Sequence, residues 1–533
     1  MPTDCISFRD TNYFSSLICD YLDERQELQP FYNRFPKIEN FEDQIEEKSL
    51  SFPAESRTIL ADALESQYAN LDASDLTKHN IQLLKKENTF TITTGHQLNL
   101  FTGPLYFLYK IISTINLTKE LKAKYPKYNF VPIYWMASED HDFDEINYFN
   151  FQGKKVRWNR DASGGVGELD TKGLDKVFET FSKELGQGKN ADFLKELFKN
   201  GYVNHDNLAD ATRFIANELF KDLGLVIVDA NNQDLKRLFI PYVKEELLNQ
   251  TSYKAVSQTN QRINDLASDY KIQVNPREIN LFYLKDNLRE RIVFENDIYK
   301  VLNTNITWSK KELLEHLNEM PERFSPNVIM RPLYQEVILP NLCYIGGGGE
   351  LAYWFQLKAY FNKVDVPFPI LLLRNSALII TKKQTQKLEK LGVSLNELFQ
   401  KQNSLVNNQV RRLSTIDIDF SSQKEHLQQQ FKALYELAEK TDKSFLGAVA
   451  AQEKKQIKGL ANLEKRLLKA QKRKLKDQIS RITDIQNQLF PGQSLQERNL
   501  NFSELYLEFG DQLIQQLVLN LQPLKGDFLI LEL

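Results

Sequence analysis

The sequence predicts an α/β protein with a parallel sheet, followed by a long helical segment. Thr91–Tyr106 and Val131–Glu145 each begin as a short apolar run of strand length and end in polar side chains. Between them, Leu105–Leu121 is apolar at helical spacing and follows a Gly-Pro start signal. A strand, a helix and a second strand in this order indicate a parallel pair with a right-handed crossover. Ligands bind beyond the carboxyl ends of such strands, so we expect both polar segments to face one site.

Composition narrows the class of protein. A chain of 533 residues suggests two to four structural units, and 42% hydrophobic residues can bury a large core. The 68 basic and 71 acidic residues nearly balance, which does not favour binding to nucleic acid or to a membrane surface. No apolar run approaches the roughly 18–20 residues that cross a bilayer, and the N-terminus lacks signal-peptide features. Three cysteines without CxxC spacing indicate neither a disulfide framework nor a cysteine zinc site. We therefore expect a cytoplasmic protein.

The α/β pattern defines the first predicted domain, residues 1–375. Its first 85 residues are expected to be helical and polar. Further strands are predicted at 224–230, 338–345 and 369–374. The segments at about 150–205 and 250–320 carry mixed short patterns and are interpreted as insertions into this core.

Residues 376–489 predict a helical hairpin or coiled-coil arm. This segment is rich in Lys, Gln, Glu and Leu, and its apolar residues recur at spacings of three and four. The repeating positions are Leu427, Phe431, Leu434 and Ala438, then Leu460, Leu463, Leu467 and Ala470, and, after a slip of one residue, Leu475, Ile479, Ile482, Ile485 and Leu489. Phe490–Gly492 ends the pattern, and residues 490–533 are expected to return to the core.

The polar residues after the first strand are candidates for binding an anion. Gly95, His96 and Gln97 follow the strand, and Thr102 and Gly103 precede the helix. Backbone N–H groups at such a turn can bind an anion. His96 could donate to a phosphate or transfer a proton. The alternative is a tight turn in which Thr102 caps the helix.

Residues 139–145, with five carboxylates and one imidazole, are the strongest catalytic candidates. Groups this close in sequence are expected to perturb one another's pKa values. Asp140, His141 and Asp142 are the predicted catalytic residues. The group could bind Mg²⁺ through oxygen ligands or position an amine, and the alternative is a solvated acidic loop.

Two later segments carry further binding candidates. Arg277, Asn327, Arg331 and Gln335 offer charged and amide groups for a carboxylate or a phosphate. A run of four glycines precedes an aromatic helix, and its candidate residues are Gly347, Gly348, Glu350 and Tyr353. We expect the glycine segments at 95–103 and 346–349 to form one composite anion-binding surface.

Together these segments resemble the bacillithiol-biosynthesis family of cysteine ligases, which add cysteine to glucosaminyl-malate. The resembling segments are Thr94–Lys110, Pro132–Asn147, Phe214–Ala230, Gln273–Arg277, Ser325–Glu336, Gly348–Trp354 and Leu495–Arg498. The resemblance implies a Rossmann-like core with connective insertions, similar to class I aminoacyl-tRNA synthetases. It also implies a nucleotide pocket and a coiled-coil arm that makes a homodimer. The HxGH and Lys-Met-Ser-Lys-Ser signatures of those synthetases are not present in this sequence.

Amide formation needs an activated carboxylate, so we expect this ligase to use ATP to activate the cysteine carboxylate, with Mg²⁺ as a candidate cofactor. Asp140, His141 or Asp142 would deprotonate the sugar ammonium, and Arg277 or Arg331 would bind malate carboxylates or phosphates. One alternative is a metal-dependent hydrolase or nucleotide-binding regulator built on residues 139–145. Another is a structural protein whose coiled coil is the functional element.

Overall fold

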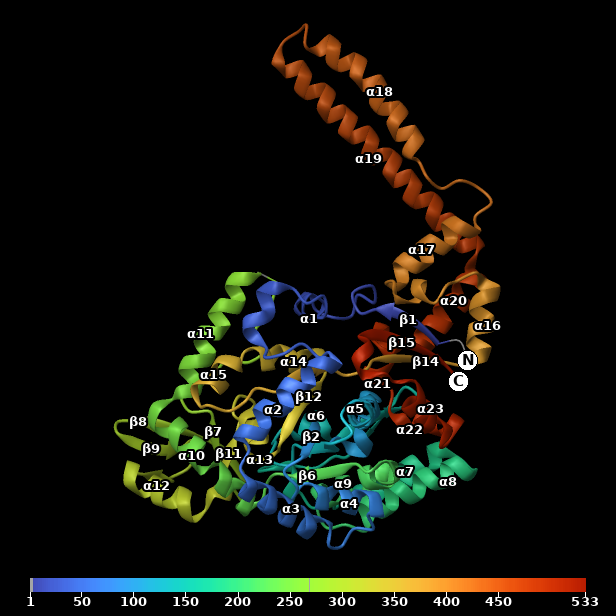
Figure 1. Ribbon diagram of the computed structural model, residues 1–533. Helices are drawn as coiled ribbons and strands as arrows, with labels where there is room; N and C mark the ends of the chain where they lie inside the picture. The colour runs from blue at the N-terminus through green and yellow to red at the C-terminus, as the bar shows by residue number, and fades with distance from the viewer. Residues whose placement is uncertain (1–2, 268) are drawn as a thin grey trace. The chain divides into compact units, whose positions relative to one another are not determined.

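The computed structural model describes residues 3–267 and 269–533, and the chain forms two compact units. The first unit combines the chain up to Leu378 with Gln496–Leu531, and the second combines Ile379–Leu495 with Glu532–Leu533. The second unit is drawn mostly in orange in Figure 1. Most residues after 495 thus belong to the same unit as the N-terminal part of the chain.

A five-stranded parallel sheet forms the core of the first unit, with the strand order β13-β12-β2-β3-β6. The strands are β2 (Thr89–His96), β3 (Asn129–Met136), β6 (Val226–Asp229), β12 (Asn341–Gly346) and β13 (Ile370–Leu373). The chain proceeds from β2 to β3 and β6 on one side, and then to β12 and β13 on the other. The order therefore reverses between β2 and β12, and the predicted α/β class is confirmed.

Strand β12 begins later than the expected strand at 338–345. Ile338 is instead the last residue of helix α13 (Arg331–Ile338). Pro332 lies in the first turn of this helix, where a missing N–H group costs nothing. Pro340 disfavours helical backbone at the residue before it. One apolar run is therefore divided between the end of a helix and the start of a strand.

Helices from distant parts of the chain pack around the sheet. The predicted crossover helix is α5 (Tyr106–Lys124), which connects β2 to β3 and is buried along most of its length. Phe41 of α2 (Phe41–Ser51) and Leu117 of α5 lie in one apolar cluster with Ile92 and Ile345 of the sheet. Further helices of this unit are α1 (Ser16–Leu22), α3 (Ala54–Tyr68), α4 (Asp75–Leu83), α9 (Leu208–Phe220), α10 (Gln233–Asn249), α14 (Gly348–Phe355) and α15 (Lys358–Lys363).

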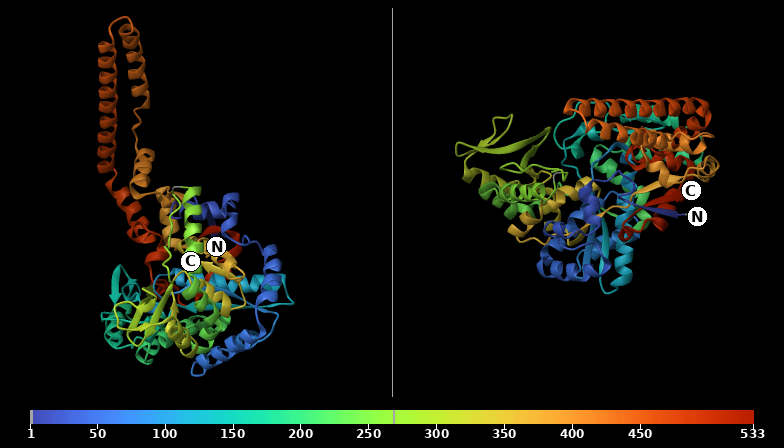
Figure 2. Two further views of the ribbon diagram at one scale, coloured as in Figure 1. Left: turned by 90° about the vertical axis from the view of Figure 1, so that its left-hand side faces the viewer. Right: turned by 90° about the horizontal axis from the view of Figure 1, so that it is seen from above.

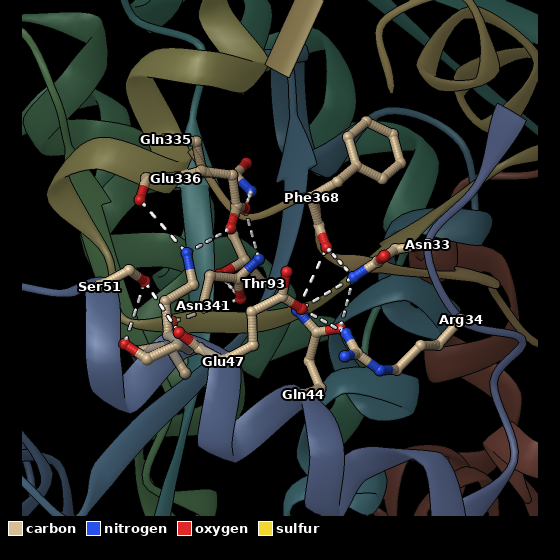
Figure 3. Close-up of polar contacts among 12 residues, drawn as sticks. Asn33, Arg34, Gln44, Glu47, Ser51, Thr93, Gln335, Glu336, Asn341 and Phe368 are labelled. Carbon is tan, nitrogen blue, oxygen red and sulfur yellow. Dashed lines mark hydrogen bonds and ion pairs between the residues drawn. The ribbon is translucent and has the colours of Figure 1, made fainter. Parts of the chain in front are cut away.

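Helix α2 also carries a buried polar contact into the core. Lys48 Nζ lies 3.2 Å from Glu336 Oε2, and both side chains are almost fully buried. The Asn341 amide donates to Glu336 Oε1 at 2.7 Å, and the Thr93 hydroxyl donates to Asn341 Oδ1 at 2.8 Å (Figure 3). This network connects α2, α13, β12 and β2, so each of its charged groups has a partner.

Strand β1 (Thr3–Ser7), which was not expected in a helical N-terminal segment, pairs antiparallel with β15 (Asp527–Glu532). Helices α21 (Gln496–Asn499), α22 (Phe502–Phe509) and α23 (Gln512–Asn520) precede β15. Arg374 and Glu497 form a buried ion pair of 2.6 Å within the same unit. The two ends of the chain are thus joined by backbone pairing.

The two predicted insertions contain small antiparallel sheets. In the first, β4 (Tyr148–Phe151) pairs with β5 (Lys154–Arg157), followed by α7 (Leu174–Leu185) and α8 (Lys189–Phe198). The second contains α11 (Thr251–Leu266), α12 (Lys310–Glu319) and a five-stranded sheet of order β10-β9-β8-β7-β11. Its strands are β7 (Leu281–Lys285), β8 (Leu288–Glu295), β9 (Ile298–Val301), β10 (Thr307–Trp308) and β11 (Phe324–Pro326).

The second unit is helical, as predicted. The chain enters it within strand β14 (Ala377–Ile380). Its helices are α16 (Lys382–Leu391), α17 (Gln402–Leu413), α18 (Ser421–Ala438), α19 (Lys443–Lys474) and α20 (Lys476–Leu489). Helices α18 and α19 form a long antiparallel hairpin (Figures 1 and 2). None of the helices in the described part of the chain is long and apolar enough to cross a bilayer.

The contacts inside this unit differ in part from the predicted apolar repeat. Leu427, Phe431, Tyr435 and Ala438 of α18 pack with Val449 of α19. Two repeat positions, Leu434 and Leu463, are 40% and 53% exposed, so neither is buried within the hairpin. Tyr435 occupies the seam in place of Leu434, and its hydroxyl donates to Glu453 Oε2 at 2.8 Å.

The one-residue slip in the repeat coincides with a break between two helices. Helix α19 ends at Lys474 and α20 begins at Lys476, with Leu475 outside both helices. Leu475 and Ile479 pack beside Val406, Val410 and Ile418. The change of helix direction allows the apolar residues after the slip to continue facing a core.

Candidate active site

A cavity of about 630 Å³ lies at the carboxyl ends of β2 and β3 and beside β12. Gly95 of β2 and Tyr344 of β12 both line it, so it lies where the strand order reverses. Open parallel sheets bind ligands at this position, because neighbouring connections leave the sheet in opposite directions there. The second insertion contributes Arg277, Phe282 and Arg289 to the wall. All lining residues belong to the first unit.

The structure brings most of the predicted site residues together around this cavity. Those that line it are Gly95, His96, Gln97, Asp140, His141, Arg277, Asn327, Arg331, Glu350 and Tyr353. Those that do not line it are Thr102, Gly103, Asp142, Gln335, Gly347 and Gly348. Residues from five separate segments thus share one cavity, while some of their close neighbours in sequence do not line it.

Packing explains why the second group lies apart. Thr102 is buried, and the Gly103 carbonyl accepts from the Asn501 amide at 2.6 Å. The Gln335 amide donates to Glu336 in the buried network described above. A Cβ atom on Gly348 would point at Ile18, 3.3 Å away, and not at a residue that lines the cavity. The glycine run therefore does not present its backbone to the cavity as expected.

The acidic segment 139–145 does not form the single cluster that we expected. Glu139 pairs with Lys236, and Asp144 pairs with Arg157 at 3.1 Å. Asp142 is exposed immediately before the short helix α6 (Phe143–Ile146). The turn and the helix direct successive side chains to different partners. Among the described residues, no three or more His, Cys, Asp or Glu side chains are grouped so as to hold a metal ion.

Asp140 and His141 are held by hydrogen bonds at the cavity wall. The Gln97 amide donates to Asp140 Oδ2 at 2.9 Å, and the His141 backbone N–H donates to Oδ1 at 2.8 Å. Burial alone would raise the pKa of Asp140, but hydrogen bonds from His141 and Gln97 and the charge of Arg289 hold it well below its usual range. Asp140 is therefore an ionised carboxylate at neutral pH.

Arg289 determines the proton position on His141. Arg289 Nη1 lies 2.6 Å from His141 Nδ1, and its guanidinium lies 4.0 Å from the centre of the Phe282 ring. A guanidinium can only donate, so Nδ1 accepts and the ring proton of neutral His141 is on Nε2. The imidazole thus presents a hydrogen-bond donor to its surroundings.

A buried lysine, Lys110 of α5, connects the floor of the cavity to helix α14. Its Nζ donates to the Gly95 carbonyl at 2.7 Å and lies 2.6 Å from Glu350 Oε2. Glu350 also accepts from the Gly347 backbone N–H at 2.8 Å and from the Tyr344 hydroxyl at 2.7 Å. The N-terminus of α14 is therefore already occupied by Glu350 of the same helix, which replaces the external anion expected there.

His96 is a buried, neutral side chain. Burial and the charge of Lys110 lower the pKa of His96 to about 3. Its Nε2 lies 3.2 Å from the Thr102 carbonyl oxygen and donates to it, and the ring packs against Tyr106 and Phe107. One ring nitrogen is thus used to hold the turn after β2.

Four arginines line the cavity, and none of them has an ion-pair partner among the described residues. In that part of the chain, no carboxylate lies within salt-bridge distance of Arg277, Arg289, Arg291 or Arg331, although Arg289 donates to His141. Arg331 lies between the rings of Trp135 and Tyr344, at 5.7 and 5.6 Å from their centres. Guanidinium groups left unpaired in a cavity favour an anionic ligand.

The sequence interpretation missed three polar residues of this site: Lys110, Lys236 and Tyr344. Lys110 carried a usable signal, because it is the single charged residue in the otherwise apolar first half of the predicted crossover helix. Lys236 carried no signal in the sequence, since it pairs with a carboxylate 97 residues earlier in the chain. Tyr344 carried no such signal, because its neighbours in the strand are apolar. Its polar role depends on the folded chain, in which its hydroxyl donates to Glu350.

The parallel sheet, its order reversal and the charged cavity define a Rossmann-like α/β protein with a small-molecule site, joined to a coiled-coil unit. Family comparisons agree with both parts. Residues 1–375 match the N-terminal Rossmann-like domain of the bacillithiol biosynthesis BshC family, and residues 377–533 match its C-terminal coiled-coil domain. The chain belongs to this family.

Three relatives show the extent of the similarity, and each is named "Putative cysteine ligase BshC". The protein from Flavobacterium johnsoniae is 61% identical over the whole of both chains. The protein from Christiangramia forsetii is also 61% identical, over 100% of this chain and 99% of its own. The protein from Cytophaga hutchinsonii is 38% identical over 97% of this chain and 96% of its own.

Proposed function

We propose that this protein is the cysteine-adding ligase of bacillithiol biosynthesis, forming an amide between the cysteine carboxyl group and the amine of glucosaminyl-malate. The observation that carries the proposal is the mixed charge of the cavity. Among the described residues, no carboxylate lies within salt-bridge distance of Arg277, Arg291 or Arg331, while Glu139 and Asp140 line the same cavity. Malate carboxylates match these guanidinium groups, and the sugar ammonium matches the carboxylates.

Amide formation also requires an activated carboxylate, because a carboxylate and an amine do not condense at useful rates in water. We propose that ATP supplies this activation by forming a cysteinyl adenylate. Phosphate oxygens would bind the same class of guanidinium groups. Mg²⁺ would accompany the nucleotide, since it is commonly bound through substrate phosphates with few protein ligands. The scattered partners of residues 139–145 favour this ligase over a hydrolase with its own metal cluster.

We further propose that the protein forms a homodimer through its coiled-coil unit. The hairpin of α18 and α19 exposes large apolar residues, among them Leu437 at 52% and Leu463 at 53%. Exposed apolar side chains on a paired helical arm favour a self-complementary contact between two copies.

The decisive experiment incubates the purified protein with cysteine, ATP, Mg²⁺ and glucosaminyl-malate, and measures the thiol product by mass spectrometry together with the nucleotide released. We expect one AMP for each amide formed. Arg331→Met should lower kcat/KM about 100-fold, or about 2.7 kcal/mol, because it removes a charge that binds an anionic substrate. Asp144→Asn alters an exposed ion pair and a local hydrogen bond to Asn147, both formed by a residue outside the cavity. It is the matched control and should retain wild-type activity.

The absence of any thiol product from the wild-type protein would refute the ligase. Release of ADP in place of AMP would show that the carboxylate is activated by phosphorylation and not by adenylation.

A further inference from the structure

The proposed ligase needs a proton acceptor, because the sugar amine arrives as an ammonium ion without a nucleophilic lone pair. The ionisable carboxylates and imidazoles that line the cavity, within the described chain, are His96, Glu139, Asp140, His141 and Glu350. Their hydrogen bonds decide which of them retains a free lone pair that faces the cavity. A general base must also lie within hydrogen-bond reach of the proton that it removes.

Four of these groups are already engaged. Asp140 accepts from Gln97 and from the His141 backbone, and Glu350 accepts from Lys110, Tyr344 and the Gly347 backbone. These donors stabilise both carboxylates as anions, which weakens them as bases.

The two imidazoles are also poor acceptors. His141 already uses Nδ1 to accept from Arg289 and carries its proton on Nε2. His96 is too buried to become charged, since burial lowers its pKa to about 3.

Glu139 differs from the others because, among the described residues, one of its carboxylate oxygens is hydrogen-bonded and the other is not. Oε1 pairs with Lys236 Nζ, which also donates to the Phe324 carbonyl at 2.9 Å. The Lys236 side chain is 1% exposed, whereas that of Glu139 is 12% exposed and lines the cavity. Within the described part of the chain, Oε2 accepts no hydrogen bond. The lysine thus anchors one oxygen and leaves the other for a ligand.

We propose that Glu139 is the general base of the ligase, accepting a proton from the substrate ammonium on Oε2, and that Lys236 is the residue that positions it. This assignment rests on the proposed function. It replaces the predicted candidates Asp140, His141 and Asp142 in the role of proton acceptor. Asp140 and His141 remain at the cavity wall as an anion and a hydrogen-bond donor.

Glu139 takes one proton from the ammonium, and the freed lone pair attacks the carbonyl carbon of the cysteinyl adenylate. The new C–N bond forms, and the C–O bond to phosphate breaks with its electron pair leaving on AMP. The nitrogen loses its second proton to solvent, and Glu139 then releases its own proton.

The charges around Glu139 suit this role. Burial raises the pKa of Glu139 above its ordinary value, and the opposing effects of Lys236 on α10 and Arg289 on β8 limit the rise. Asp229 at the end of β6 adds a smaller effect that raises it. Glu139 is therefore a stronger base than an exposed glutamate, while a buried ammonium partner favours its ionised form.

Separating the two half-reactions tests the proposal. Glu139→Gln should lower the rate of amide formation by about 10²–10⁴-fold, the usual contribution of a general base. The same variant should retain cysteine-dependent exchange of pyrophosphate into ATP within about threefold of wild type, because carboxylate activation involves no amine. Asp144→Asn is the control in the same segment and should match wild type in both assays.

The pH dependence of kcat/KM provides a second test, because it would not change if Glu139 had a purely structural role. Activity should fall as pH drops through the pKa of Glu139, because the base must be ionised. Lys236→Met removes the charge that lowers this pKa, so the acidic limb of kcat/KM should shift to higher pH. Glu139→Asp keeps a carboxylate, so it should retain an acidic limb with a reduced rate. This variant keeps the test valid if Glu139→Gln does not fold.

The expected results distinguish failure of the ligase proposal from failure of the role proposed for Glu139. A wild-type protein that forms neither exchanged ATP nor thiol refutes the ligase itself. With an active wild type, amide formation by Glu139→Gln within threefold of wild type would overturn the role of Glu139. Equal loss of both half-reactions in a folded Glu139→Gln protein would overturn it too, because the residue would then act in activation.

Discussion

Buried charges in the first unit are paired across segments that are far apart in sequence. Lys48 pairs with Glu336, and Arg374 pairs with Glu497. Removing two charges from water is costly, and the attraction between them compensates only when the remaining hydrogen-bonding groups are satisfied. Asn341 supplies such a bond to Glu336. Each pair therefore makes the fold sensitive to the loss of one partner.

Lys48→Met should lower the free energy of unfolding by about 3–5 kcal/mol, because it leaves Glu336 buried without its counter-charge. Urea denaturation followed by circular dichroism measures the effect. Lys154→Met is the control, since the Lys154–Glu184 pair is largely exposed and such pairs contribute about 0–1 kcal/mol. Equal effects of the two substitutions would show that the buried pair contributes no more than an exposed one.

At the scale of single elements, the end of β2 and the start of α14 relate differently to the cavity. A Cβ atom on Gly95 would lie 3.2 Å from the Tyr344 hydroxyl and 3.9 Å from Arg331 Nη1, and both residues line the cavity. On Gly348 it would contact Ile18 on α1. Of the two glycine segments expected to form one composite anion-binding surface, only the end of β2 therefore lines the cavity in the described structure.

Gly95→Ala should weaken binding of malate or ATP about tenfold, or about 1.4 kcal/mol, because the added methyl group displaces the Tyr344 hydroxyl and occupies space beside Arg331. Gly348→Ala is the matched control and should leave affinity unchanged while altering stability slightly through Ile18. Isothermal titration calorimetry on both variants measures these affinities and shows which glycine lies at the binding site. A larger loss of affinity in Gly348→Ala than in Gly95→Ala would show that the anion binds at the glycine run before α14 and not at the end of β2.

At the scale of the whole molecule, assembly through the coiled-coil unit can be tested on exposed residues. Leu467 and Ile482 are unsuitable, because both pack within the chain. Leu437→Lys combined with Leu463→Lys should convert the proposed dimer to monomer, since charges on a contact surface oppose its burial. Light scattering should then give the chain mass of 62.2 kDa in place of twice that value.

Leu519→Lys is the control for assembly, because Leu519 is 71% exposed and lies in the first unit. It should leave the dimer intact. A monomeric wild-type protein, or an unchanged mass in the double variant, would contradict assembly through the coiled coil.

The sequence by itself determined the class of fold and the region of the site. Apolar spacing predicted β2, α5 and β3, because the period of buried residues is a local property of helices and strands. The same local signal predicted the helical second unit, including the slip at Leu475 where one helix ends. The position of strand ends in a parallel sheet then indicated where polar residues would meet.

Tertiary structure alone decided which side chains face the cavity. Glu139, Asp140 and Asp142 are near neighbours in sequence, yet the first pairs with Lys236, the second contacts Gln97 and the third is exposed outside the cavity. These directions depend on the backbone turn after β3 and on partners contributed by distant segments. Pairing of β1 with β15 has the same origin, since each strand finds its partner at the opposite end of the chain. Sequence periodicity reports burial, whereas the identity of a partner depends on how distant segments pack.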